Sequence, residues 1–199
     1  MDHGAACVIG EMVSAKGLTY GDRKSAELLE LDEDIRPAAI QLFGDDPAIM
    51  AQAAKQALDF HPDWIDINFG CPAPKIVGNH TGSALMREPD LCRRIVQAVK
   101  EAVPVPVTAK IRKGYAKDEV NAVVGALACE AGGADGVSLI NTLMGMRIDL
   151  KSKKPIIKNK TGGLSGPAIK PVAVRMIYQV YEGVKIPIVG MGGVSRAED

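Results

Sequence analysis

The chain has 199 residues, and its composition is that of one ordinary globular domain. Hydrophobic residues make up 47% and charged residues 24%, which excludes a disordered or collagen-like chain. Lysine and arginine together number 24, as do aspartate and glutamate, so no global basic field exists to attract nucleic acid or a membrane surface. Any contact with RNA must therefore come from a local patch.

The sequence contains no pattern typical of a membrane helix, a secretion signal or a metal site. No apolar run approaches the roughly 18 residues of a membrane helix, and the first residues lack the layout of a secretion signal, so we expect a cytoplasmic protein without a membrane span. The four cysteines form no CxxC pair, which argues against a disulfide scaffold and a zinc site. The three histidines have no metal-ligand spacing, and we assign no metal.

Short apolar runs alternate with longer amphipathic or alanine-rich stretches along the chain. The predicted strands cover residues 7–13, 38–43, 64–69, 105–111, 136–141 and 186–190. Their interiors are nearly continuous in apolar residues, as expected of parallel strands that are covered on both faces.

Helix start and stop signals lie between these strands. Asp46-Pro47, Glu88-Pro89 and Lys170-Pro171 open helices that run to residues 60, 102 and 181. A fourth helix is predicted over residues 118–131, closed by Gly132-Gly133. Alternating strands and helices predict a parallel sheet with right-handed crossovers, either open and doubly wound or closed into a barrel.

Polar or reactive residues gather at the carboxyl end of almost every predicted strand. They are Gln41, Asn68, Cys71, Lys110, Arg112, Asn141, Thr142 and the glycines of 190–193. An open doubly wound sheet has its site at one switch point, whereas every strand of a (β/α)8 TIM barrel contributes at its carboxyl end. The pattern favours the barrel, as a single domain over residues 1–199. Because such barrels have eight strands and about 250 residues, six strands predict an incomplete one.

Cys71 is the first candidate for chemistry, because it follows Asn68 and Gly70 on the tight exit of a strand. A cysteine in that position can act as a general acid or base. The alternative is a small buried packing residue, which most free cysteines are. For Cys7, Cys92 and Cys129, which lie within strand or helix patterns, we expect packing.

Lys110 is the second candidate, at the end of an apolar strand and directed into the barrel mouth. A buried ammonium needs an anionic partner, because its desolvation without one is costly. A phosphate, a carboxylate or a reduced flavin ring would serve. The alternative is a structural ion pair with Asp66.

Two glycine clusters and one long connection complete the candidates. Residues 161–166 precede a helix and residues 190–193 follow a strand, and backbone N–H groups in such places bind phosphate. The connection over residues 147–166 is long enough for a lid or binding loop. Its five lysines could touch a phosphate backbone, or form an ordinary solvated surface.

Two consecutive parts of the chain resemble two different protein families. From about residue 4 to 115 the chain resembles a tRNA-dihydrouridine synthase, through CVIGEMVSAKGL, AIQLFGDDP, DINFGCPAPKIVGNHTGSALMREP and VPVTAKIRKGY. From about 130 to 199 it resembles a class 1 (1B-like) dihydroorotate dehydrogenase, through AGGADGVSLINTLMGMRIDL, TGGLSGPAIKPVAVRMIYQV and IPIVGMGGV. The crossover lies near residues 116–129. Both families are FMN-dependent barrels, and the resemblance makes the six strands the second to the seventh.

The resemblance also implies roles for individual residues. Cys71 is implied as the catalytic proton donor or acceptor at C5 of a pyrimidine. The implied cofactor-binding residues are Gln41, Lys110, Gly163, Ser165, Gly192 and Gly193, with Lys110 placed against the flavin. The implied substrate-binding residues are Asn68, Asn141 and Thr142.

Departures from both families leave the function open between three hypotheses. The His-Gly-Arg-Thr motif of the synthases is replaced by Ile140-Asn141-Thr142, and their helical RNA-binding domain is missing. Ala73 stands where the dehydrogenases have Asn, and their N-terminal asparagine-bearing loop is missing. The hypotheses are reduction of uracil in tRNA, oxidation of dihydroorotate, and a non-catalytic barrel fragment that self-associates through its unpaired edges.

Overall fold

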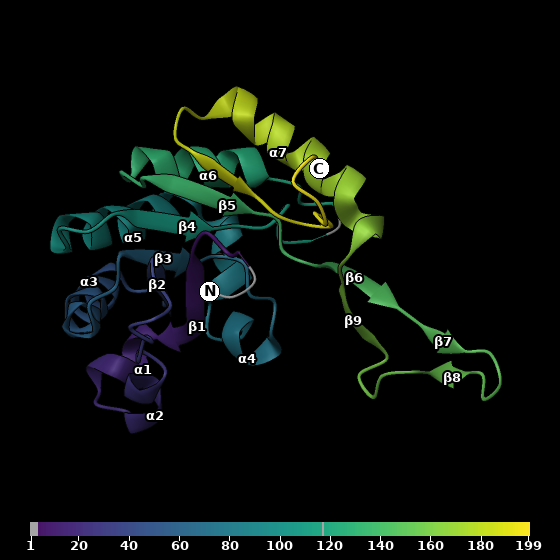
Figure 1. Cartoon of the computed structure of the whole chain (residues 1–199), viewed down its shortest axis with the longest axis horizontal. Coiled ribbons are helices and arrows are strands. Elements are labelled where there is room, and N and C mark those ends of the chain that lie inside the picture. The colour runs from purple at the N-terminus through teal and green to yellow at the C-terminus, as the bar shows by residue number, and fades with distance from the viewer. Residues whose placement is uncertain (1–3, 117) are drawn as a thin grey trace.

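The computed structural model describes residues 4–116 and 118–199. Its main sheet has six parallel strands: β1 (Val8–Ser14), β2 (Ala38–Phe43), β3 (Trp64–Asn68), β4 (Val107–Lys110), β5 (Gly136–Leu139) and β10 (Ile188–Gly190). All six lie within or beside the predicted runs. Their order in the sheet follows the chain, β1-β2-β3-β4-β5-β10 (Figure 1). A doubly wound sheet would reverse its order at a switch point, so this is the sheet of a partial barrel, as predicted.

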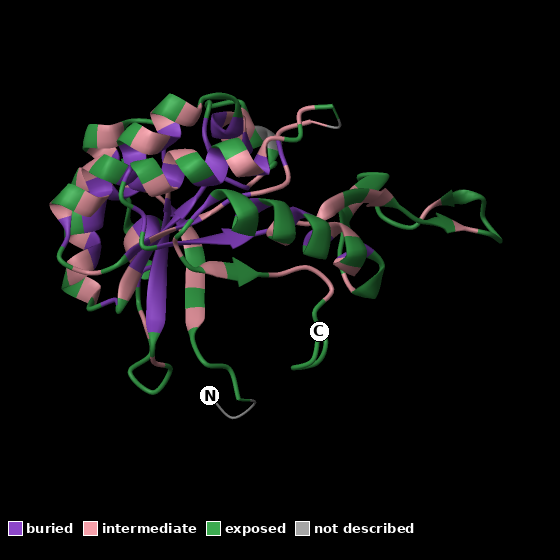
Figure 2. Cartoon of the chain, turned by 90° about the horizontal axis from the view of Figure 1, so that it is seen from above, coloured by how far each residue is buried: buried purple, intermediate pink, exposed green. Residues whose placement is uncertain are grey.

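Four longer helices cover one face of this sheet (Figures 1 and 2). They are α3 (Pro47–Ala57), continued by η1 (Leu58–Phe60), α5 (Pro89–Ala102), α6 (Ala122–Ala131) and α7 (Lys170–Gly183). The Asp46 carboxylate caps α3 by accepting the N–H groups of Ala48 and Ile49 at 2.8 and 3.1 Å. The start signal at Asp46-Pro47 is thereby confirmed.

The predicted start of α6 at Asp118 is wrong. Residues before Ala122 are held in another arrangement, because Gly114 and Val120 form an isolated antiparallel bridge. The N–H groups of Asn121 and Ala122 also both donate to the Lys113 carbonyl, at 3.1 and 3.2 Å. The helix begins only after this turn closes.

Short elements lie in the connections. They are α1 (Ala15–Thr19), α2 (Arg23–Glu27), α4 (Pro74–Val77), η2 (Gly82–Arg87) and η3 (Pro167–Ile169). Sequence patterns did not predict them, because three to six residues are too few for a helical period to show.

The core fills the space between the sheet and its helices. Ile65 and Ile67 of β3 are fully buried toward the helices, and the alternate residues of the strand face the other way. On α5, Ile95 and Val99 are fully buried as well. Burial of each such side chain stabilises the fold by roughly 1.5–3 kcal/mol. The helices therefore fix the sheet, and the opposite face of the sheet is available for polar groups.

The connection after β5 is a two-stranded ribbon rather than a structureless loop. β6 (Leu143–Met146) pairs antiparallel with β9 (Thr161–Leu164), and β7 (Ile148–Asp149) pairs with β8 (Lys154–Pro155). We call residues 143–164 the arm, and it extends away from the sheet (Figures 1 and 2). Its strands of two to four residues are too short for an alternating pattern to predict.

Within the described residues, the outer edges of β1 and β10 have no partner strand. A largely apolar groove of about 800 Å³ runs along β10 and α7, with Val174, Tyr178 and Tyr181 among its lining residues. In the same described part of the chain, no helix is long and apolar enough to span a bilayer.

Candidate functional site

Polar side chains of four neighbouring strands share the sheet face opposite the helices. The parallel register places Gln41 beside Asp66, and Asp66 beside Thr108. It also places Lys110 between Asn68 and Ser138. Since residues two apart on a strand share a face, these side chains form one cluster at the carboxyl ends of β2 to β5. Gln41, Asn68 and Lys110 therefore lie on one face of the sheet.

Asp66 is the centre of this cluster and is only 1% exposed. Its carboxylate accepts hydrogen bonds from Gln41 Nε2 at 2.6 Å and from Thr108 Oγ1 at 2.5 Å. Gln41 Oε1 in turn accepts from Asn68 Nδ2 at 2.8 Å. A carboxylate only accepts, so Asp66 fixes which way the amide of Gln41 and then that of Asn68 must point. Burial raises the pKa of the Asp66 carboxyl, while hydrogen bonds from Thr108 and Gln41 and the charge of Lys110 oppose that rise.

The loop that carries Cys71 is held by the oriented amide of Asn68. Asn68 Oδ1 accepts the N–H groups of Gly70 and Cys71, each at 2.9 Å. The Cys71 carbonyl accepts the N–H of Ser83 at 2.9 Å. Gly82 has φ +60°, and a Cβ there would lie 2.6 Å from the Cys71 carbonyl oxygen, so only glycine fits this approach. Cys71 itself is half-buried.

Residues after β4 and β5 support the same loop. The Gly70 carbonyl accepts from Asn141 Nδ2 at 2.7 Å and from Arg112 Nη1 at 3.1 Å. Asn141 Oδ1 accepts the N–H of Thr142 at 2.8 Å. The structure therefore brings Asn141 against the Cys71 loop, and Thr142 beside Asn141.

Lys110 is a half-buried cation that no anionic side chain of the described residues pairs with. Burial lowers the pKa of its ammonium, and the charge of Asp66 partly restores it. Among the residues that the structure describes, no ion pair or hydrogen bond joins Lys110 to another side chain, so the alternative of a Lys110–Asp66 ion pair is wrong. The neighbouring Ser138 is 4% exposed, and its Oγ has no hydrogen-bond partner in the part of the chain that the structure describes. A free ammonium and a free hydroxyl side by side fit an anionic or carbonyl-bearing ligand.

The other cysteines are not equivalent to Cys71. Cys92 on α5 and Cys129 on α6 are buried, as predicted, and burial raises the pKa of the Cys92 thiol to about 12. Burial also raises the pKa of Cys129. The packing role predicted for Cys7 is wrong, because this residue precedes β1 and is exposed.

The two glycine clusters lie in different parts of the structure. Gly192 and Gly193 have φ of +126° and +78°, and a Cβ on Gly193 would lie 2.6 Å from the Gly166 carbonyl and 2.9 Å from the Lys170 nitrogen. The exit of β10 therefore packs on the start of η3 and α7, where backbone N–H groups favour an anion. Gly163 lies instead at the base of the arm, where a Cβ would meet Thr142 Oγ1 at 2.5 Å. Ser165 is exposed beside it.

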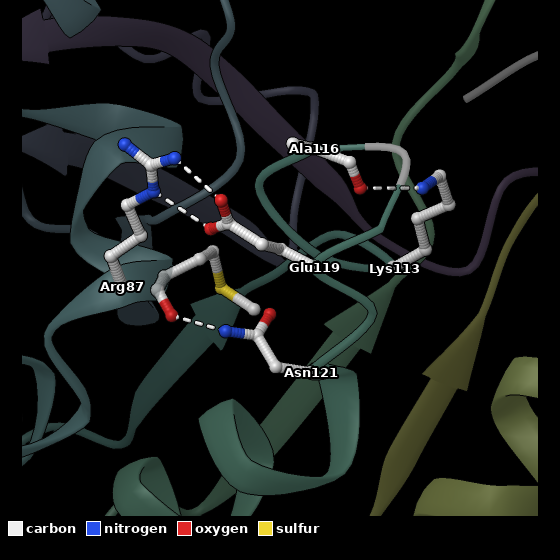
Figure 3. Close-up of polar contacts among 6 residues, drawn as sticks. Arg87, Lys113, Ala116, Glu119 and Asn121 are labelled. Carbon is white, nitrogen blue, oxygen red and sulfur yellow. Dashed lines mark hydrogen bonds and ion pairs between the residues drawn. The ribbon is translucent and has the colours of Figure 1, made fainter.

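A further polar cluster ties the β4–α6 connection to η2 (Figure 3). Arg87 donates to both carboxylate oxygens of Glu119, at 2.7 and 2.5 Å, and its guanidinium lies 3.9 Å from the centre of the Tyr115 ring. Asn121 Nδ2 donates to the Met86 carbonyl at 2.5 Å. The N–H of Ser83 in η2 donates to the Cys71 carbonyl. Because the Arg87 cluster fixes η2, it also stabilises the position of the Cys71 loop.

Sequence reasoning missed several of these residues. Asp66 was considered only as a partner of Lys110, and the participation of Thr108 and Ser138 was not predicted. Strand alternation was the available signal, since residues two before Asn68 and Lys110 must share their face. The pairing of Arg87 with Glu119 had no local signal, because the two are 32 residues apart.

Fold and site together define a parallel barrel-type α/β protein whose polar site lies at the carboxyl ends of its strands. The family model named Dihydrouridine synthase (Dus) matches residues 2–140. The chain belongs to the dihydrouridine synthase family.

Named relatives extend the comparison. The chain is 48% identical over 194 residues to the dihydroorotate dehydrogenase B (NAD(+)) catalytic subunit of Bacillus pumilus, which covers 94% of this chain and 59% of that protein. It is 42% identical over 196 residues to the subunit of that name from Bacillus mycoides, which covers 96% of this chain and 60% of the relative. The subunit from Listeria monocytogenes serotype 4b is 53% identical over 135 residues, or 68% of this chain and 42% of the relative. The chain thus spans about half the length of these relatives.

Among solved structures, a putative deoxyribose-phosphate aldolase from Toxoplasma gondii ME49 aligns with 66% of the chain and 47% of its own. Its TM-score is 0.42 and its identity 18%, and we draw no conclusion from it.

Proposed function

We propose that this chain carries the site of an FMN-dependent oxidoreductase that acts on the C5–C6 bond of a pyrimidine, with dihydroorotate as the preferred substrate. The observation that carries the proposal is the cluster around Lys110, in which the half-buried ammonium and the buried Ser138 hydroxyl both lack partners among the described residues. The relatives named dihydroorotate dehydrogenase B match 94% and 96% of the chain, which favours dihydroorotate over uracil in tRNA.

The residues present fit FMN at two separated points. Lys110 and Ser138 offer a positive charge and a hydroxyl to the polar edge of a flavin ring. Gly192 and Gly193, packed on the start of α7, offer backbone N–H groups to a phosphate. Gln41 would also contribute to FMN binding, because hydrogen bonds with Asp66 and Asn68 fix its amide in the same cluster. When bound, FMN would accept the hydride that leaves C6 of the substrate.

Cys71 would move the proton in this reaction. In the oxidation of dihydroorotate, the C5–H bond breaks with its proton passing to the Cys71 sulfur as the C5=C6 double bond forms. Lys110 and Arg112 both lie near Cys71, so two cationic side chains border the point where the proton would be transferred. The loop held by Asn68 and Ser83 fixes where that sulfur sits.

The decisive experiment is anaerobic titration of the FMN-loaded protein with dihydroorotate. We expect the flavin absorbance band to bleach as the cofactor is reduced, and no bleaching would contradict the dihydroorotate assignment. FMN binding itself is measured separately by thermal unfolding. A ligand present at 100 times its Kd stabilises the folded state by about 2.7 kcal/mol.

Uracil in tRNA is the second candidate, because the dihydrouridine synthase model matches 139 residues, 2–140. Incubation of the reduced protein with unmodified tRNA, followed by nucleoside mass spectrometry, tests it. New dihydrouridine without flavin bleaching by dihydroorotate would reverse our preference. Failure to bind FMN at all would support the third possibility, a non-catalytic fragment.

A further inference from the structure

Asp66 is a buried acidic residue that the proposed reaction does not use directly. It lies two residues before Asn68 on β3 and is 1% exposed. Both of its oxygens accept a hydrogen bond, Oδ1 from Thr108 Oγ1 and Oδ2 from Gln41 Nε2. A carboxylate is among the most costly groups to bury, and a packed apolar side chain in its place would often be as stable. Its place in the middle of the polar cluster therefore calls for a role other than stability.

The hydrogen bonds that start at Asp66 can run in one direction only. Because a carboxylate accepts and does not donate, Gln41 must turn its Nε2 toward Asp66 and its Oε1 toward Asn68. Asn68 must then offer its Nδ2 to Gln41, at 2.8 Å. Gln41 is 7% exposed and Asn68 6%, so water has little access to replace either bond. The charge on Asp66 thereby sets the orientation of two neighbouring amides.

The far end of this series of hydrogen bonds is the backbone of the Cys71 loop. Asn68 Oδ1 accepts the N–H groups of Gly70 and Cys71, each at 2.9 Å. Its Nδ2 also lies 3.7 Å from the sulfur of Met12, so both ends of the amide are occupied within the protein. A reversed Asn68 amide would place its NH2 group against two backbone donors and leave both without an acceptor.

The loop is held from two sides, and Asp66 is connected to only one of them. The Gly70 carbonyl is held by Asn141 and Arg112, which follow other strands. The N–H groups of Gly70 and Cys71 are held by Asn68 alone. A change in the orientation of the two amides should therefore appear first at these two N–H groups.

We propose that Asp66 is a positioning residue for proton transfer, because it orients Gln41 and then Asn68 so that Asn68 holds the loop that carries Cys71. The proposal rests on the proposed function only for the role of the Cys71 sulfur. The hydrogen-bond series itself is tested without substrate or cofactor.

An exchange of donor and acceptor between positions 41 and 66 tests the direction of the series. Gln41→Glu alone places a second carboxylate against Asp66, so the orientation of Asn68 is no longer fixed. In Asp66→Asn/Gln41→Glu, the amide at position 66 donates to the carboxylate at position 41, which still accepts from Asn68. Amide hydrogen exchange of Gly70 and Cys71, measured by NMR on the full chain, reports the result. Relative to the amides of α5, we expect exchange about 10- to 100-fold faster in Gln41→Glu and a return to the wild-type rate in the double variant.

The surface of α5 provides a matched control. Gln97 Nε2 donates to Glu101 Oε1 at 2.8 Å, and this amide–carboxylate pair is exposed. Gln97→Glu and the double variant Gln97→Glu/Glu101→Gln make the same chemical changes there, and both should leave the exchange of Gly70 and Cys71 unchanged.

Catalysis gives a second measurement. With saturating FMN and dihydroorotate, flavin reduction should be about 10- to 100-fold slower in Gln41→Glu and should recover in the double variant, because misplacement of a reacting group by about 1 Å has an effect of this size. If the wild type shows no flavin reduction, the proposed function fails, while the exchange measurement still decides the role of Asp66.

Two results would overturn the proposal. One is wild-type exchange of Gly70 and Cys71 in Gln41→Glu, and the other is a double variant that exchanges as fast as Gln41→Glu or does not fold. If Gln41→Glu itself does not fold, Gln41→Met replaces it, since it removes the link to Asn68 without adding charge. The same faster exchange is expected there, and its absence would equally contradict the role of Asp66.

Discussion

The Cys71 sulfur is one atom in a loop that four other parts of the chain hold in place. If the proposed function is correct, Cys71→Ala should slow turnover by about 10² to 10⁴, the usual contribution of general acid–base catalysis, and leave FMN affinity unchanged. Stopped-flow measurement of flavin reduction by substrate checks this. Cys7→Ala is the matched control, because Cys7 is exposed and distant along the chain. Unchanged turnover in Cys71→Ala would remove this thiol from the mechanism.

Asp66 gives a prediction on pH. Its pKa is raised above the unfolded value of 3.8, so the folded state holds its proton more tightly than the unfolded state does. The stability that this residue contributes is present below pH 3.8 and is lost as the pH rises through the raised value. Relative to Asp66→Asn, the wild type should therefore lose free energy of unfolding as the pH rises from 3.8 through the raised pKa of Asp66. Urea unfolding followed by the fluorescence of Trp64, the one tryptophan, measures this difference, and a constant difference across that range would contradict it.

At the scale of elements, the contact between the Cys71 loop and η2 depends on Gly82. Gly82→Ala adds backbone strain at φ +60° and a clash with the Cys71 carbonyl, whereas Gly21→Ala at φ +77° adds strain alone, because nothing lies within 4 Å. We expect about 1 kcal/mol of destabilisation for Gly21→Ala and about 2–3 kcal/mol for Gly82→Ala. Urea unfolding gives both values, and the reaction rate of the Cys71 thiol should change only in the Gly82 variant. Equal losses in the two variants would mean that the loop does not rest on η2.

Elements and site differ in how far the sequence predicts them. Continuous apolar strands and proline-marked helix starts depend on local patterns, which is why β2 lies where residues 38–43 were predicted. The start of α6 depends on a turn closed by Lys113, and the ribbon of the arm on pairing between residues 143–146 and 161–164, which no local pattern shows. Gln41, Asn68 and Lys110 could be predicted as a cluster because they all end parallel strands. The lack of an ion pair at Lys110 within the described residues could not be predicted, because it depends on the hydrogen bonds that Asp66 accepts from Gln41 and Thr108.

At the scale of the whole molecule, the arm is the part most open to a protease. It carries six exposed basic residues, and its base joins β5 to η3, outside the helix-covered sheet. Trypsin should therefore cut first between residues 147 and 160. The two fragments should stay together, because β10 remains paired with β5. Mass spectrometry and gel filtration of the nicked protein check this, and a first cut in α5 or release of the C-terminal fragment would contradict it.

The order of strands in the sheet also bears on how the chain folds during synthesis. From β1 to β5, each strand pairs with the strand made just before it, so each new unit can add to a surface that already exists. At about 5 to 20 residues per second, a ribosome delivers one such unit every few seconds, which is long compared with helix and hairpin formation. β10 is the exception, because it must wait for the whole arm and α7 before it reaches β5. The sheet can thus assemble from its N-terminal end in the order of translation, and its last strand is the one that completes the predicted phosphate loop.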